Sequence, residues 1–273
     1  MQKLKNAFDF LHQTKSEINK SEKVFLFLDY DGTLTEIKNN PEYAKPGKKL
    51  IEFINTTDNP KFVISIISGR TLKDLVKILN KTDLTKINLI GNHGAEIKFA
   101  AINNNVYKYS DISMANYKTI KILKKKIREY ANNIANSQIE EKPFSFALHY
   151  RNSPLKEMTK IKELTDYLKE QKKIYKFRYL KMKKVIEVLP TDLNKGSVVP
   201  LILEKYVKST QYIKNTFIIC IGDDITDEDL FNANQTGINI KVSSLYSLTK
   251  TAASYYLKNP DEVLSFLEKI VIL

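Results

Sequence analysis

The sequence predicts an α/β protein with a Rossmann-like parallel sheet as its core and an inserted α+β domain. Three apolar runs predict buried strands, and each ends in polar residues; they span residues 24–28, 62–67 and 217–221. Unbroken apolar runs of this kind are typical of parallel strands that helices cover on both faces. A long segment with a different pattern separates the second run from the third, and we expect it to be the inserted domain.

The composition is that of an ordered globular protein. Hydrophobic residues make up 42% of the 273 residues, and Gly and Pro number only 8 each, which excludes long low-complexity segments. This length exceeds the usual size of one domain, so we expect about two. The single cysteine, Cys220, lies in the third apolar run. We therefore expect a buried thiol and no disulfide within the chain.

The chain is basic, with 44 Lys and Arg against 31 Asp and Glu. Such an excess favours acidic partners, but most of it is Lys at helical spacing, which is typical of a solvated helix face. No compact basic stripe interleaved with aromatic residues is found, and no apolar run reaches the ~18 residues of a membrane span. The first twenty residues also lack a secretory apolar stretch. We expect a cytoplasmic protein, with a monomer favoured, that binds a small molecule and neither nucleic acid nor membrane.

The core elements follow one another in the order of an α/β fold. Apolar side chains at helical spacing near the N-terminus predict a helical extension over residues 1–20. A helix near residues 47–55 joins the first two strands in a right-handed crossover. We expect a discontinuous core domain made of residues 21–100 and 190–273.

Residues 101–189 predict the small inserted α+β domain. A hairpin is expected over residues 98–109, followed by a helix, a strand, a second helix and two strands, over residues 115–135, 143–151, 155–171 and 174–189. Alternation along the first of these strands places its aromatic and aliphatic side chains on one face and its polar ones, including His149 and Arg151, on the other. We expect helices to cover the apolar face and a polar cleft to adjoin the other.

A first acidic motif, Asp-Tyr-Asp-Gly-Thr-Leu at residues 29–34, follows the first buried strand. Two carboxylates two residues apart at a strand tip project to nearly the same side, so one can attack phosphorus while the other hands a proton to the leaving oxygen. Gly32 permits a sharp turn, and Thr33 offers an amide or hydroxyl to phosphate. A turn that closes a strand would account for one Asp and one Gly but not for the whole run.

A second acidic motif, Gly-Asp-Asp-Ile-Thr-Asp-Glu at residues 222–228, follows the third buried strand. Negative charge concentrated there needs a cation to neutralise it, and Mg²⁺ prefers such hard oxygen ligands. Alternatively, Asp224 or Thr226 caps the following helix, with Asp227 and Glu228 favoured in its first turn. Capping and metal binding are compatible.

Two further polar residues lie where a phosphoryl group would be held. Ser68 ends the second strand, where its hydroxyl can hydrogen-bond a phosphoryl oxygen, and Lys195 begins a helix, where ammonium and helix N-terminus both favour developing negative charge. Alone, a Ser-Gly-Arg turn or a surface Lys is commonplace. Ligands of open α/β sheets bind outside the carboxyl ends of the strands, so we expect all these groups to meet at one site.

This ordered set resembles the four motifs of the haloacid dehalogenase superfamily. The resemblance implies that Asp29 is a nucleophile that forms an aspartyl-phosphate, and that Asp31 acts first as general acid and then as general base. It implies that Ser68 and Lys195 hold the phosphoryl group. It also implies a magnesium site whose ligands are Asp29, the carbonyl of Asp31 and Asp223. Asp224 and Asp227 would contact the metal through water or support the direct ligands.

Three more stretches are similar to the trehalose-6-phosphate phosphatase family: Gly-Asn-His-Gly-Ala-Glu at 91–96, Phe-Ala-Leu-His-Tyr-Arg at 146–151 and Val-Ile-Glu-Val-Leu-Pro at 185–190. The resemblance implies Mg²⁺-dependent hydrolysis of trehalose 6-phosphate, the last step of trehalose biosynthesis, with the inserted domain as a cap over the sugar. The substrate-binding candidates are Arg70, His93, Glu96, Lys142, Arg151, Lys183 and Glu187. His93 is equally explained as a capping residue, and Lys142, Arg151 and Lys183 as surface charges.

Three alternatives remain at this stage. One is a capped phosphatase for another sugar phosphate, such as mannosyl-3-phosphoglycerate, sucrose 6-phosphate or a hexose phosphate. A phosphomutase would pass the phosphoryl group to a sugar and release no inorganic phosphate. A non-catalytic sugar-phosphate sensor would be expected to lack the nucleophile, and Asp29 is present.

Overall fold

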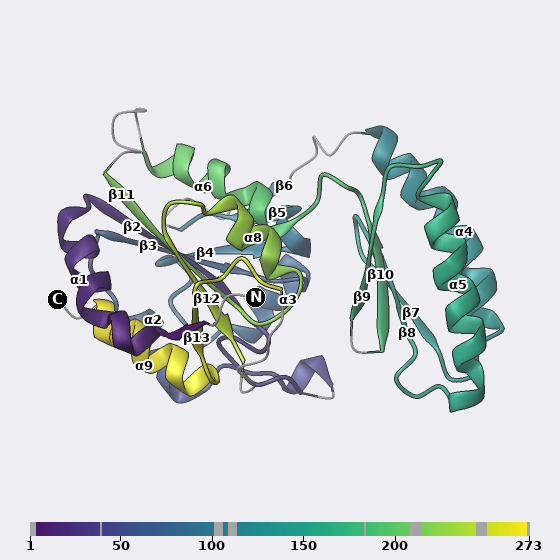
Figure 1. The fold of residues 1–273 in the computed structure, drawn as a ribbon, viewed down its shortest axis with the longest axis horizontal. Helices are drawn as coiled ribbons and strands as arrows, with labels where there is room; N and C mark the ends of the chain where they lie inside the picture. The colour runs from purple at the N-terminus through teal and green to yellow at the C-terminus, as the bar shows by residue number, and fades with distance from the viewer. Residues whose placement is uncertain are drawn as a thin grey trace. The chain divides into compact units, whose positions relative to one another are not determined.

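The computed structural model describes residues 4–38, 40–100, 106–108, 114–182, 184–207, 215–243 and 250–271. The chain forms two compact units (Figure 1). We call Met1–Lys108 with Asn194–Leu273 the core unit, and Tyr109–Leu193 the inserted unit. The predicted fold class, a mostly parallel α/β core with an inserted α+β segment, is confirmed.

Within the described residues, the core unit contains a nine-stranded sheet of order β1-β13-β12-β11-β2-β3-β4-β5-β6. Its strands are β1 Lys5–Asn6, β2 Lys23–Asp29, β3 Phe62–Ile67, β4 Ile87–Gly91, β5 Glu96–Lys98, β6 Val106–Lys108, β11 Thr216–Gly222, β12 Ile238–Val242 and β13 Tyr255–Leu257. All are parallel except β5 and β6, which continue the sheet antiparallel. The three strands predicted from apolar runs are neighbours, because β2 pairs with both β11 and β3. Their polar ends therefore meet at one edge.

Helices cover both faces of the core sheet. In the parts of this unit that the structure describes, the α-helices are α1 Leu11–Lys20, α2 Lys48–Thr56, α3 Leu72–Ile78, α6 Val198–Tyr206, α8 Asp227–Ala233 and α9 Pro260–Val271. The 3₁₀ turns there are η1 Ala7–Phe10, η2 Pro41–Tyr43, η3 Asn92–Gly94 and η5 Lys195–Ser197. Alternate side chains of β2 enter two different hydrophobic clusters: Leu26 packs with α2 and α9 residues, and Phe27 with α6 and α8 residues. Burial on both faces explains the unbroken apolar runs, at about 1.5–3 kcal/mol for each large side chain. Cys220 is buried as predicted.

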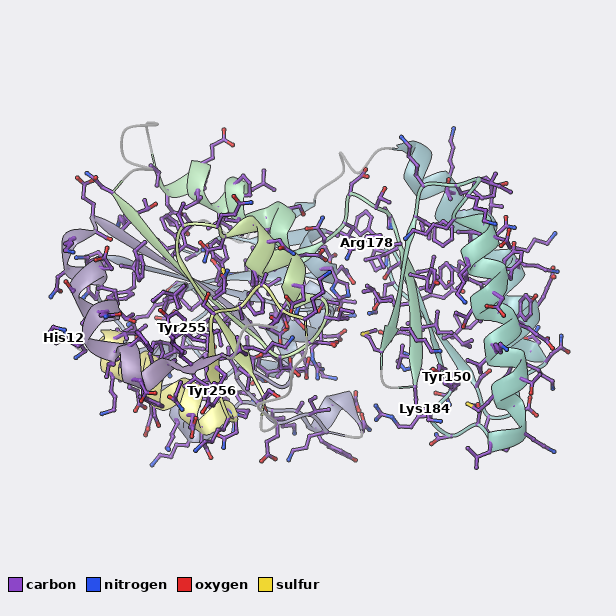
Figure 2. The ribbon with its side chains drawn as sticks, viewed as in Figure 1. His12, Tyr150, Arg178, Lys184, Tyr255 and Tyr256 are labelled. Carbon is purple, nitrogen blue, oxygen red and sulfur yellow. The ribbon has the colours of Figure 1, made fainter. Side chains whose placement is uncertain are left out.

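The inserted unit is an antiparallel sheet with helices on one face. Its order is β7-β8-β10-β9, and its elements are α4 Met114–Asn132, β7 Gln138–Glu141, β8 Phe146–His149, η4 Leu155–Glu157, α5 Met158–Gln171, β9 Arg178–Met182 and β10 Val185–Leu189. Phe146 and Leu148 pack in one cluster with Leu123 of α4 and Leu164 of α5, which confirms the predicted alternation. Figure 2 labels Tyr150 and Lys184 beyond the ends of β8 and β10, where the Tyr150 amide donates to the Lys184 carbonyl at 3.0 Å.

The structure differs from the prediction at the N-terminus. The helix expected over residues 1–20 begins only at Leu11, because Lys5 and Asn6 pair with β13. The Asn6 side chain then caps η1, accepting from the Phe8 amide at 2.9 Å, and the Phe8 ring packs edge-on against Phe266 at 5.8 Å. The N-terminal segment is thus an integral edge of the core.

The inserted unit differs from the prediction in its bounds and in one additional strand. The inserted unit runs from Tyr109 to Leu193 and not from 101 to 189, because the β5–β6 hairpin pairs with β4 and extends the core sheet. Strand β7 was not predicted, since Ile139 is its only apolar residue. Among the described helices, none combines the length and apolar character needed to cross a membrane.

Candidate active site

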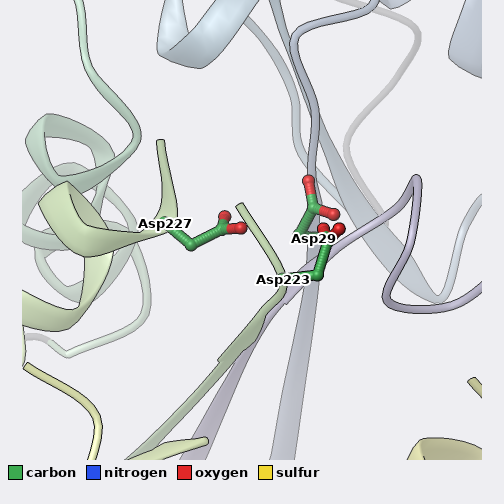
Figure 3. Close-up of side chains that lie close together, drawn as sticks. All are labelled: Asp29, Asp223 and Asp227. Atoms are coloured by element: carbon green, nitrogen blue, oxygen red, sulfur yellow. The ribbon is translucent and has the colours of Figure 1, made fainter. Parts of the chain in front are cut away.

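Three carboxylates converge at the polar edge of the core sheet. Asp29 ends β2, Asp223 follows β11 and Asp227 begins α8; one oxygen of each lies within 4.8 Å of the others. Figure 3 shows the three side chains pointing toward one another. Asp29 and Asp227 are almost completely buried. The cluster forms because β2 and β11 are adjacent parallel strands whose carboxyl ends coincide.

Lys195 neutralises part of this charge. Its Nζ donates to Asp29 Oδ1 at 2.5 Å and to Asp227 Oδ1 at 2.7 Å, and its side chain is only 3% exposed. The 3₁₀ turn that carries it is capped by Asn194, whose side chain accepts from the Ser197 amide. Burial alone would lower the pKa of Lys195, but the charges of Asp227 and Asp29 outweigh it and raise the pKa.

The remaining negative charge fits a divalent cation. Burial, with the charges of Asp227 and Asp223 added, raises the pKa of Asp29 well above its ordinary value in spite of Lys195. Burial, and then the charge of Asp227, raises the pKa of Asp223 to about 7. Asp29 Oδ2 and Asp223 Oδ1 are buried without a hydrogen-bond partner. Such orphaned oxygens beside an excess of carboxylate charge are suited to a hard cation.

Glycine is required beside the cluster. Gly32 has φ +89°, and a Cβ added there would lie 2.2 Å from Asp223 Oδ2. Likewise, a Cβ on Gly222 would lie 2.2 Å from Asp227 Cγ. The glycines of both acidic motifs therefore make room for the carboxylates.

Asp31 lies apart from the cluster and is bound by Arg70. Arg70 Nε donates to Asp31 Oδ2 and Nη2 donates to Asp31 Oδ1, both at 2.6 Å. The guanidinium also lies 5.7 Å from the centroid of the Tyr30 ring. Arg70 was predicted as a substrate ligand, and the structure brings it to Asp31, a contact that no sequence signal indicated.

The other predicted core residues divide into two groups. Ser68 is buried at the tip of β3, where its hydroxyl accepts from the Arg70 amide at 3.1 Å, and the buried Thr33 hydroxyl has no partner. Asp224, by contrast, is outside the carboxylate cluster, because its Oδ1 accepts from the amide of Ile225 at 2.6 Å. The structure thus brings Asp227, and not Asp224, to the predicted metal ligands.

The loop at residues 91–96 contacts the turn that carries Ser68 and Arg70. The His93 amide donates to the Ser68 carbonyl at 3.0 Å, and the Asn92 amide to the Arg70 carbonyl at 2.7 Å. Glu96 Oε2 accepts from Asn92 Nδ2 at 2.6 Å and from the amide of Leu72 at 3.1 Å. His93 and Glu96 therefore brace this turn.

The inserted unit holds a second polar group of residues on the sheet face opposite its helices. Glu187 is 2% exposed and accepts from Lys142 Nζ at 3.0 Å and from Ser145 Oγ at 2.7 Å. Glu140 shares this face by register and lies 2.8 Å from His149 Nε2. No sequence motif marks Glu140, although alternation around Ile139 indicates the face on which its side chain lies.

Two further residues were predicted to bind the sugar. Arg151 lies in the exposed turn after β8. Lys183 lies outside the described residues.

A buried Asp–Lys–Asp cluster at the strand tips of a parallel sheet that carries an insertion defines a phosphatase of the haloacid dehalogenase class. A family model described as trehalose-phosphatase matches residues 27–261. The chain therefore belongs to the trehalose-phosphatase family.

Similar proteins agree with this assignment. "Probable trehalose-phosphate phosphatase E" of Arabidopsis thaliana is 31% identical over an alignment of 276 residues that covers 96% of this chain and 74% of that protein. "Alpha,alpha-trehalose-phosphate synthase [UDP-forming] B" of Dictyostelium discoideum is 31% identical over 263 residues, but this chain spans only 31% of its length. The solved C-terminal domain of the C. albicans trehalose-6-phosphate phosphatase superposes with a TM-score of 0.79 at 26% identity, over 96% of this chain and 97% of that one.

Proposed function

We propose that this chain hydrolyses trehalose 6-phosphate to trehalose and inorganic phosphate, the last step of trehalose biosynthesis, with Mg²⁺ as its metal ion. The observation that carries this proposal is the buried cluster of Asp29, Lys195, Asp223 and Asp227 in a member of the trehalose-phosphatase family. A buried cluster of this charge destabilises a fold, so its presence points to a chemical role.

In the first half of the proposed reaction, Asp29 Oδ2 attacks phosphorus. Lys195 holds Oδ1 of the same carboxylate, which leaves Oδ2 as the oxygen without a hydrogen bond. The new bond to Asp29 forms as the bond from phosphorus to the sugar oxygen breaks, and Asp31 gives its proton to that oxygen. The products of this half are trehalose and an aspartyl-phosphate on Asp29.

In the second half, Asp31 acts as general base. It takes a proton from a water molecule, which attacks the phosphorus of the aspartyl-phosphate and regenerates the Asp29 carboxylate. The hydroxyls of Ser68 and Thr33 are candidates to donate to the phosphoryl oxygens, and the Lys195 ammonium offsets their charge. Phosphoryl transfer depends mainly on such alignment and charge neutralisation.

The metal would be held by Asp29, Asp223 and Asp227, or by some of them through water. Asp223 Oδ1, buried and unpaired, is the best candidate for a direct ligand. When bound, Mg²⁺ supplies positive charge beside the transferring phosphoryl group.

The polar face of the inserted unit supports a sugar substrate. Glu187 and Glu140 supply acceptors and Lys142 supplies a donor, and carboxylates and ammonium groups on one face suit the hydroxyls of a disaccharide. Arg151 and Lys183 remain proposed ligands of the same kind. Other sugar phosphates would use the same core chemistry, so the polar residues of the inserted unit would determine which sugar phosphate is bound.

A non-catalytic role is less well supported. The fold also occurs in the solved C-terminal domain of a Candida albicans trehalose synthase regulatory protein, which superposes with a TM-score of 0.71 at 14% identity, so the fold alone is not decisive. This chain keeps both the Asp29 carboxylate and its Lys195 partner.

Phosphate release from a panel of sugar phosphates tests the proposal. With Mg²⁺, trehalose 6-phosphate should be hydrolysed far faster than glucose 6-phosphate or sucrose 6-phosphate, and EDTA should stop the reaction. Asp29→Asn should abolish turnover, whereas Asp166→Asn, at an exposed ion pair, should not. Equal rates on all sugars would refute the substrate, and an active Asp29→Asn protein would refute the nucleophile.

A further inference from the structure

The ion pair between Arg70 and Asp31 is the contact of the core site that the proposed reaction leaves unexplained. Two parallel hydrogen bonds of 2.6 Å join the Nε–Nη2 edge of the guanidinium to both oxygens of the carboxylate. The Arg70 side chain is 11% exposed and that of Asp31 is 33% exposed. This edge of Arg70 is the one that would bind a phosphate side-on, and Asp31 already engages it.

The two hydrogen bonds from Arg70, which we call the Arg70 fork, determine how the Asp31 carboxylate is oriented. Torsion about the last bond of an Asp side chain is broad, so packing alone specifies the plane of its oxygens poorly. Proton transfer to a leaving oxygen requires that one carboxylate oxygen come within hydrogen-bond distance in a defined direction. A planar guanidinium that grips both oxygens supplies this direction.

We propose that Arg70 is a positioning residue for Asp31. It fixes the plane of the Asp31 carboxyl group before substrate arrives. The oxygen that carries the proton for the sugar oxygen, and that later takes a proton from water, gives up its hydrogen bond to Arg70, while the other oxygen keeps its own. The inference rests on the proposed phosphatase function and adds to it a role for a residue that lies beyond the four motifs.

The turn that carries Arg70 is itself braced from behind. The Arg70 amide donates to the Ser68 hydroxyl, and the Arg70 carbonyl accepts from the Asn92 amide. Asn92 and His93 are both left-handed, with φ 49° and 55°, a conformation that is costly away from glycine and persists where the surrounding structure enforces it. The His93 ring also fills the space beside Gly69, where a Cβ would lie 2.7 Å from it. The bracing fixes the backbone from which the Arg70 fork reaches Asp31.

Variants of Arg70 in two backgrounds test the inference. Arg70→Met and Arg70→Lys are made in the wild type and in Asp31→Asn, and kcat and KM are measured with trehalose 6-phosphate and with p-nitrophenyl phosphate. Arg70→Met should lower kcat on the sugar phosphate by about 10- to 100-fold with little change in KM, because misplacing a catalytic group costs rate. Arg70→Lys should recover only part of this rate, since an ammonium cannot form the two parallel bonds.

The double variants separate positioning from direct substrate contact. If Arg70 acts through Asp31, Arg70→Met should have almost no further effect in the Asp31→Asn background. The loss should also be smaller with p-nitrophenyl phosphate, whose leaving group needs no proton in the first step. An equal loss in both backgrounds, or a rise in KM at constant kcat, would overturn the inference and assign Arg70 to the substrate.

Two controls complete the experiment. Arg128→Met removes another ion-paired arginine, which pairs with Glu141 in the inserted unit, and should leave kcat unchanged. Thermal melting of each variant establishes that it is folded. If the wild type hydrolyses another sugar phosphate and not trehalose 6-phosphate, the proposed substrate fails, and the same ratios measured on that sugar phosphate decide the role of Arg70.

Discussion

Replacing Lys195 by methionine should strongly destabilise the metal-free protein. The substitution removes an ammonium that lies 2.5 Å from Asp29 Oδ1 and 2.7 Å from Asp227 Oδ1, and it leaves three clustered carboxylates without a counter-charge. Removing one partner of a buried ion pair costs about 3–5 kcal/mol, because the other charge stays desolvated. At roughly 2–4 °C per kcal/mol for a protein of this size, the melting temperature should fall by about 6–20 °C.

Calorimetric unfolding in EDTA and in excess Mg²⁺ measures this effect. Mg²⁺ should stabilise Lys195→Met more than it stabilises the wild type, because the cation then supplies charge that the ammonium no longer provides. Adding Asp29→Asn to Lys195→Met should restore part of the lost stability, since one uncompensated charge is removed. Turnover should be lost in both variants.

A surface pair provides the matched control for Lys195. Lys169 lies 2.8 Å from Asp166, and the two side chains are 59% and 50% solvent-exposed. Lys169→Met should therefore leave the free energy of unfolding almost unchanged. If Lys195→Met were as mild as this control, the electrostatic account of the cluster would be refuted.

Three further predictions concern the metal site and the sugar. Because burial raises the pKa of Asp223 from its ordinary 3.8 to about 7, the folded metal-free protein binds this proton more tightly than the unfolded chain. The contribution of this group to stability should be complete below about pH 4 and be lost as the pH rises through 7, as urea unfolding in EDTA would detect; a rise in stability over that range would contradict it. Gly32→Ala, which adds a Cβ 2.2 Å from Asp223 Oδ2 at φ +89°, should abolish Mg²⁺ binding in titration calorimetry, and unchanged affinity would count against the site. Glu187→Gln should lower kcat/KM for trehalose 6-phosphate by about 10- to 100-fold, the worth of a charged hydrogen bond, while p-nitrophenyl phosphate is hydrolysed as before. Equal losses on both substrates would exclude a role in sugar binding.

Local patterns were sufficient to predict the strands of the core and the composition of the site. A strand buried on both faces has to be apolar throughout, so β2, β3 and β11 were evident without tertiary information. The acidic residues could be placed at one edge because parallel strands end together. Likewise, because side chains alternate between the two faces of a strand, the sequence predicts which residues of β8 pack in the hydrophobic cluster.

Only the tertiary structure decided which polar side chains meet. Arg70 pairs with Asp31 across 39 residues of sequence. The residues next to Arg70 do not indicate whether its guanidinium binds a carboxylate of the protein or a phosphate of the substrate. Asp227 enters the carboxylate cluster in place of Asp224, because the turn into α8 directs the Asp224 oxygen back to a backbone amide.

The N-terminal strand β1 also depended on the tertiary structure. Its pairing with β13 joins residues 250 positions apart, and the helical spacing of apolar residues near the N-terminus does not predict this contact. The sequence by itself determined the fold class and the residue types that phosphoryl chemistry needs, because both follow from local periodicity and local charge. The partners of those residues were decided by the tertiary structure, because side-chain direction and strand register arise only when distant segments pack.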